Sequence, residues 1–102
     1  MTGVQTCALP IFVATNDDMA AAVLWIAHQR GIGVPANLSV TGFDDTLIAT
    51  RVWPSLTTVR QPIKAMAREA VGWLARAVRH PRQHSTPQDI VLPFALIERG
   101  SG

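Results

Sequence analysis

Two short apolar runs, each followed at once by polar side chains, enclose one Ala-rich segment near the start of the sequence. The first run is Ile11–Thr15 and the second is Leu38–Phe43. Between them, Asp17 to about Arg30 has the length and composition of a helix, and Gly31 is placed to end it in the left-handed conformation. A strand, a helix and a second strand in this order form a parallel crossover unit. The pattern therefore predicts an α/β fold with a parallel sheet.

The rest of the sequence continues this alternation. Thr46–Arg51 is predicted to form a short helix, and the stretch LTTV, Leu56–Val59, to form a third strand. Pro62 suits the first turn of a long helix that reaches about Arg79, because a proline there needs no N–H partner. Two further strand candidates are DIVLP, residues 89–93, and ALIER, residues 95–99.

The composition is that of a soluble globular unit or of a piece of one. Of the 102 residues, 48% are apolar and only 16% are charged, which argues against intrinsic disorder. The net charge is +2, but the basic side chains are scattered without interleaved aromatic residues, so we expect no nucleic-acid surface in this chain. The single Cys7 permits no internal disulfide, and no apolar run is long enough to span a membrane.

The first eleven residues, MTGVQTCALPI, need a separate explanation. They have neither the charged start nor the cleavage site of a secretory signal. Gly3–Ile11 resemble instead a translated sequencing adapter joined in frame to a gene. We therefore expect residues 1–11 to be a non-native leader, and the natural N-terminal part of the protein to be missing.

The predicted first helix has apolar side chains on two sides, with Asn16 or Asp17 as its N-cap. The side that we expect to pack on the sheet consists of Met19, Ala22, Val23, Ile26 and Ala27. The opposite side consists of Ala21, Leu24, Trp25 and His28. A large apolar patch on this second side predicts a partner, which we take to be another subunit. The alternative is that Trp25 lies flat under a loop.

The adjacent carboxylates Asp44 and Asp45 follow the second strand and admit three interpretations. They could form a turn or a helix cap, which requires no ligand. Asp44 could instead converge with Asn16 at the carboxyl edge of the sheet and bind a hydroxylated small molecule, since a carboxylate accepts O–H groups and an amide both donates and accepts. A magnesium site that includes Asp17 and Asp18 is disfavoured, because the one lysine that such phosphoryl chemistry would need lies inside a predicted helix.

Sequence motifs of the common enzyme classes are missing. The sequence has no Gly-x-Ser-x-Gly elbow, no glycine-rich phosphate loop and no Cys-x-x-Cys pair. We therefore expect neither an enzyme nor a bound cofactor or metal.

Four segments in this order resemble one known family: ATNDDMA, GIGVPANLSVTGFDD, PSLTTVRQP and LIERGS. Together they resemble the C-terminal part of the effector-binding region of lactose/galactose-repressor-type bacterial transcription regulators. The resemblance covers everything after Pro10. It implies that the chain is a truncated, parallel-sheet βαβ fragment of the two-lobed, periplasmic-binding-protein-like (type I) fold, which holds its ligand between the lobes.

The resemblance also implies roles for individual residues. Asn16 and Asp44 match positions that face the effector in the family. Gln61, near a crossover between the lobes, and Ile63, at an apolar contact, are further effector-site candidates. The outer side of the first helix and the segment after the second strand match the homodimer interface, which implies Ala21, Leu24, Trp25, Leu47, Ile48, Arg51 and Val52.

The resemblance divides the chain between the two lobes. Residues 12–61 would lie mainly in the C-terminal lobe, residues 62–93 would return mainly to the N-terminal lobe, and residues 94–102 would end as a C-terminal strand. The apolar stripe of the second long helix, which includes Ile63 and Leu74, would then lack the sheet that it packs against.

A parent protein of this family would be a cytoplasmic homodimer that senses a small molecule, most commonly a sugar. It would bind operator DNA only through an N-terminal helix-turn-helix, which is absent from this chain, and effector binding would control that step by allostery. The alternative is a periplasmic sugar-binding protein of a transport system, because such proteins share the fold.

Overall fold

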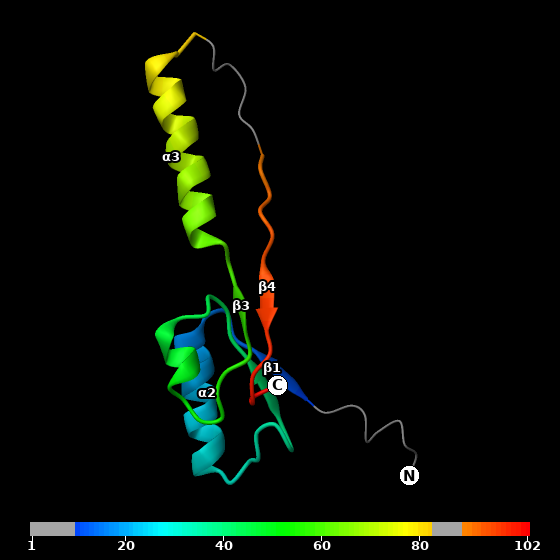
Figure 1. The fold of residues 1–102 in the computed structure, drawn as a ribbon. Helices are drawn as coiled ribbons and strands as arrows, with labels where there is room; N and C mark the ends of the chain where they lie inside the picture. The colour runs from blue at the N-terminus through cyan, green and yellow to red at the C-terminus, as the bar shows by residue number, and fades with distance from the viewer. Residues whose placement is uncertain (1–9, 83–88) are drawn as a thin grey trace, which may run out of the picture. The chain divides into compact units, whose positions relative to one another are not determined.

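The computed structural model describes residues 10–82 and 89–102 (Figure 1). The chain divides into two compact units. The first unit runs up to Arg60 and takes in Ala95–Gly102, and the second unit is Gln61–Phe94. Each unit is described by itself below.

Most of the predicted leader, including Cys7, lies outside the described residues, so its non-native origin stays a prediction. Its last two residues are described. The Pro10 carbonyl accepts a hydrogen bond from the Ser39 N–H at 3.0 Å, and Ile11 pairs with Ser39. The parallel sheet therefore begins at the end of this segment.

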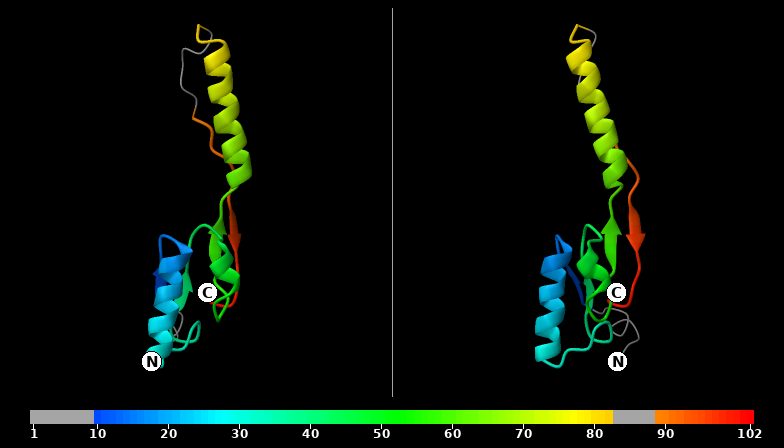
Figure 2. Two further views of the ribbon diagram at one scale, coloured as in Figure 1. Left: turned by 90° about the vertical axis from the view of Figure 1, so that its left-hand side faces the viewer. Right: turned by 60° about the vertical axis from the view of Figure 1, so that its left-hand side comes forward.

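The predicted strand, helix and strand are present in the first unit. β1, Ile11–Val13, pairs in parallel with β2, Ser39–Thr41, and α2, Asp17–Gln29, connects them and lies beside the sheet (Figures 1 and 2). The register sets Val13 opposite Thr41. The α/β class is confirmed, although both strands are shorter than the apolar runs suggest.

Both ends of α2 are capped as the sequence predicts. Asn16 is the N-cap in an extended conformation, and its Oδ1 accepts a hydrogen bond from the Met19 N–H at 2.8 Å. Asp17 and Asp18 occupy the first turn, where the exposed N–H groups favour negative charge. Gly31 follows the helix with a φ of 68°, a conformation that glycine adopts without steric cost.

The side of α2 that packs inside matches the prediction at Ala27 and Val23 and differs from it elsewhere. The buried side consists of Asp17, Ala20, Leu24 and Ala27. Leu24, which was expected on the exposed side and in the dimer interface, is only 2% exposed, whereas Met19 is 52% exposed. Ala22 and Ile26, also expected in the core, are exposed. In an Ala-rich helix with two apolar sides, hydrophobic periodicity cannot decide which side is buried.

A short 3-10 helix and two more strands complete the first unit. η1, Leu47–Thr50, lies within the predicted short helix, and β3, Thr58–Arg60, overlaps the predicted third strand. β3 pairs in an antiparallel manner with β4, Ala95–Ile97, which falls within the candidate ALIER. The candidate DIVLP, residues 89–93, is not a strand, and its Pro93 could not donate to a ladder.

The two strand pairs are joined through Thr57 and Ser101. A parallel bridge between Thr41 and Thr57 connects β2 to the segment that leads into β3. The fully buried Ser101 donates its hydroxyl to the Val40 carbonyl at 2.6 Å and accepts from the Thr57 N–H at 2.8 Å. The last residues of the chain therefore hold the two strand pairs together.

A buried carboxylate connects the start of α2 with η1 and β3. Asp17 is fully buried, and its Oδ2 accepts from the N–H of Thr46 at 2.6 Å and from the Thr46 hydroxyl at 3.0 Å. Its Oδ1 accepts from the hydroxyl of Thr58 at 2.7 Å. Gly42 passes so close that a Cβ there would overlap Asp17 Oδ1 and lie 2.9 Å from Leu56 Cδ2. Only glycine fits this position without a shift of its neighbours.

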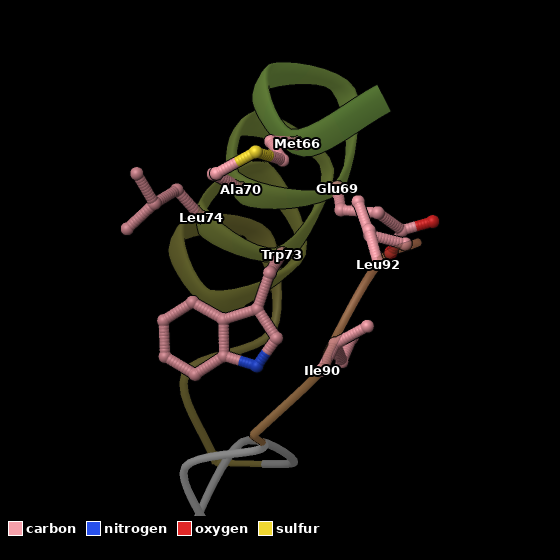
Figure 3. A pocket seen from close by; sticks show the side chains of 7 residues that line it. All are labelled: Met66, Glu69, Ala70, Trp73, Leu74, Ile90 and Leu92. Carbon is pink, nitrogen blue, oxygen red and sulfur yellow. The ribbon is translucent and has the colours of Figure 1, made fainter. Parts of the chain in front are cut away.

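The second unit contains α3, Ile63–Arg79, which begins directly after Pro62 as predicted. None of its residues is buried, and Ile63 and Leu74 are both exposed. A pocket of about 370 Å³ lies between α3 and the returning chain (Figure 3). Its lining consists of Met66, Glu69, Ala70, Trp73, Leu74, Ile90 and Leu92.

Among the described residues, no helix is long and apolar enough to cross a membrane.

Candidate functional site

Asn16 and Asp44 leave the sheet at the same edge. β1 and β2 run in parallel with Val13 opposite Thr41, and each polar residue lies three positions beyond its member of this pair. The carboxyl ends of parallel strands form the edge at which ligands bind in open α/β sheets. The register therefore brings out an amide and a carboxylate at the edge where the sequence predicts a binding site.

Asn16 has a structural and a potential binding function. Its Oδ1 caps α2 through Met19, and its side chain is half-buried. Because the cap uses only the oxygen, the Nδ2 group of the amide remains a donor of two N–H groups.

The Asp44–Asp45 turn has an uncommon backbone. The φ angles are 108° at Asp44 and 53° at Asp45, in a region of backbone conformation that residues other than glycine rarely adopt. Each such residue costs about 1–3 kcal/mol, so the surrounding contacts must offset this cost and hold the turn. The backbone N–H of Asp44 donates to the Val59 carbonyl at 2.9 Å, and that of Asp45 to the hydroxyl of Thr58 at 3.3 Å.

The Asp45 carboxylate is engaged by two arginines. Oδ2 accepts from Arg60 Nε at 2.7 Å, and Oδ1 accepts from Arg99 Nη2 at 2.8 Å. Burial alone would raise the pKa of Asp45, but the hydrogen bonds and positive charges of Arg60 and Arg99 outweigh burial and lower it. For Asp45 the structural interpretation of the acidic pair is therefore the right one.

The structure also shows the surroundings of Asp17 and Asp18, the other acidic residues of the disfavoured metal interpretation. The Asp17 carboxylate accepts three hydrogen bonds, one from a backbone N–H and two from hydroxyls. Asp18 lies exposed in the first turn of α2. Within the described ranges, no three His, Cys, Asp or Glu side chains are arranged to hold a metal ion.

Gln61 and Ile63, the other predicted effector-site residues, belong to the second unit. Gln61 directly follows the last residue of β3 and is half-buried. Ile63 is the first residue of α3 and is exposed. Their assignment to the site stays a prediction.

The predicted dimer surface overlaps in part with a shallow pocket between α2 and the segment after η1. The pocket measures about 300 Å³ and is lined by Ala21, Leu24, Trp25, His28, Val52 and Trp53. Trp25 and Leu47 are exposed, Arg51 is exposed, and Ile48 is half-buried. Leu24 is buried in this chain and offers a partner little surface, and its place in a dimer interface stays a prediction. His28 Nε2 donates to the Trp53 carbonyl at 2.9 Å across this surface.

Three residues important to the site were not found from the sequence. Arg99 and Thr58 hold the carboxylates of Asp45 and Asp17 over separations of 54 and 41 positions. Trp53 is exposed and lines the same pocket as Trp25. An arginine such as Arg99, which follows shortly after the last strand, indicates that an ion pair is possible, but the sequence alone does not show which carboxylate is its partner.

Comparison with known proteins assigns the family. Residues 5–102 match the family model of the periplasmic binding protein-like domain. The HTH-type transcriptional regulator DegA of Bacillus subtilis is 46% identical over 88 residues, which is 86% of this chain and 26% of DegA. The solved complex of the transcriptional regulator CelR with cellobiose has a TM-score of 0.82 and 32% identity, over 90% of this chain and 28% of that one. This chain belongs to the LacI/GalR-type effector-binding regions.

The LacI/GalR-type assignment confirms the resemblance and the periplasmic-binding-protein-like fold. A LacI family regulator from Lactobacillus casei, solved with bound sucrose, adds a TM-score of 0.74 at 28% identity, over 90% of this chain and 33% of that one. The relatives are transcription regulators, and the family is not one of enzymes. The chain spans about a quarter of the length of the curated relatives that it matches.

We expect Asp45→Asn to lower the free energy of unfolding at pH 7 by about 1 kcal/mol, because it removes the charge between two arginines. The lowered pKa of the folded state means that this contribution is present above the unfolded-state pKa of about 3.9 and is lost as the pH falls through the folded-state pKa. Urea unfolding between pH 7 and pH 3 should show the gap to the parent protein constant near neutral pH and narrowing only at the acidic end. The exposed Asp18→Asn is the control, and a gap that widens toward pH 3 contradicts the assignment.

Proposed function

We propose that this chain is the sugar-sensing part of a DNA-binding transcription regulator. The observation that carries the proposal is the shared edge from which Asn16 and Asp44 emerge. Two relatives support a carbohydrate as the effector, since CelR was solved with cellobiose and the Lactobacillus casei regulator with sucrose.

The two side chains offer what a sugar needs. A sugar hydroxyl both donates and accepts hydrogen bonds, so a carboxylate and an amide N–H are complementary partners for it. Asp44 would accept from ligand hydroxyls, and the Nδ2 group of Asn16 would donate to a hydroxyl or ring oxygen. Gln61 and Ile63 offer a polar and an apolar side chain within the second unit, and their part in effector binding stays a prediction.

The complete protein would act as a cytoplasmic homodimer. Effector binding would favour one arrangement of its two lobes, and the dimer would transmit that bias to a helix-turn-helix that binds the operator and lies outside this chain. The surface around Trp25, Leu47 and Val52 supports such a dimer, because it exposes large apolar side chains beside the pocket.

Asn16→Asp separates binding from capping in the complete protein. Aspartate is as good an N-cap as asparagine, so the free energy of unfolding should change little, but the amide donor becomes an acceptor. We expect titration calorimetry with cellobiose and sucrose to show at least a tenfold loss of affinity for whichever sugar binds. Asp44→Asn should weaken binding similarly, and the exposed Asp18→Asn should not. Unchanged affinity in both the Asn16 and the Asp44 variant would contradict the site.

The combined substitution Trp25→Ala and Leu47→Ala should dissociate the proposed dimer, because it removes two exposed apolar side chains from the surface that would be buried. Light scattering during size-exclusion chromatography would report the mass. Arg30→Ala is a suitable control, since Arg30 is exposed and lines a different pocket with Phe12 and Ile26. A double variant that keeps the mass of the parent protein would rule this surface out.

A further inference from the structure

The turn that carries Asp44 has a backbone conformation that residues other than glycine adopt uncommonly. Asp44 and Asp45 are consecutive, neither is glycine, and both have positive φ angles, 108° and 53°. Such conformations persist where the surrounding contacts determine them, and they are concentrated at binding sites. The contacts of this turn therefore decide where Asp44 lies.

Arg99 is the fixed support of the turn. Its Nη1 donates to the Leu56 carbonyl at 3.0 Å, and its backbone N–H donates to the Thr57 hydroxyl at 2.8 Å. Its side chain is only 16% exposed, whereas that of Arg60 is 57% exposed. Arg99 is thus held in place without Asp45, and its Nη2 presents a second donor to the Asp45 carboxylate.

The carboxylate of Asp45 has little capacity left for a ligand. Arg60 donates to Oδ2 and Arg99 donates to Oδ1 of Asp45, and only 9% of the Asp45 side chain is exposed. A charge-assisted pair on each oxygen fixes the direction of this side chain, and with it the backbone of the preceding residue.

We propose that Asp45 is a positioning residue for the effector site: anchored by Arg99, it locks the turn so that Asp44 is presented to a hydroxylated ligand that Asp45 itself does not touch. The inference rests on the proposed function of Asp44 and deepens it, because it names the ion pair that sets the affinity of the site. It also predicts an order of importance among the arginines, with the half-buried Arg99 more important than the exposed Arg60.

The test is a double-mutant cycle on the complete protein, with cellobiose and sucrose as probes in titration calorimetry. Asp45→Asn should weaken binding about tenfold, Arg99→Lys severalfold, and Arg60→Lys less than Arg99→Lys. In an Asp44→Asn background, Asp45→Asn should have less than a twofold effect, because a residue that acts through Asp44 loses its influence when the Asp44 carboxylate is gone. A purely structural role would instead give the same loss in both backgrounds, and this result would overturn the proposal.

The failures of the two hypotheses can be distinguished. Weak binding by Asp44→Asn with parental affinity in Asp45→Asn overturns the positioning role and leaves the sensor proposal intact. Parental affinity in Asp44→Asn removes Asp44 from the site, and the positioning role fails with it. If neither sugar binds, the crystal structure of the Asp45→Asn protein decides: we expect a negative φ for at least one of the two residues, and two unchanged positive angles overturn the proposal.

Discussion

The buried carboxylate of Asp17 is the interaction on which the first unit depends. An ionised group removed from water costs several kcal/mol unless hydrogen bonds replace its hydration, and Asp17 receives three of them from Thr46 and Thr58. These donors lie 29 and 41 positions away in the sequence. One side chain in the first turn of α2 therefore fixes the segment after the Asp44–Asp45 turn and the first residue of β3. The glycine at position 42 is the steric counterpart, because it lets this part of the chain pass over the carboxylate.

The acidic residues at this edge of the sheet have two different functions: some hold the chain in place, and we assign effector binding to another. Asp17 supports the segment from inside, and Asp45 supports it through Arg60 and Arg99. We assign binding to Asp44 and to the amide of Asn16, which emerge at equivalent positions after two parallel strands. Two of the four carboxylates in this region, Asp17 and Asp45, thus form a framework of hydrogen bonds and ion pairs.

Local signals in the sequence predicted the fold more reliably than long-range contacts. The Asn16 cap, the left-handed Gly31 and the start of α3 after Pro62 each depend on a few neighbouring residues, and all three were predicted. The buried side of α2 was predicted only in part, with Ala27 and Val23 in the core but Met19 and Ile26 exposed, because apolar residues on both sides give the same periodicity. The partnership of Asp45 with Arg99 spans 54 positions, so no sequence pattern reveals it. Likewise, DIVLP has the composition of a strand but does not form one.

The measurement that tests this account most directly is the coupling free energy between Asp17 and Thr58. Urea unfolding of the complete protein with Asp17→Ala, Thr58→Val and both substitutions yields this quantity. We predict a coupling of about 1–2 kcal/mol, since either single substitution breaks the same buried hydrogen bond and the second then costs less. Effects that add to within about 0.3 kcal/mol would show that the carboxylate does not hold β3, and the account would be contradicted.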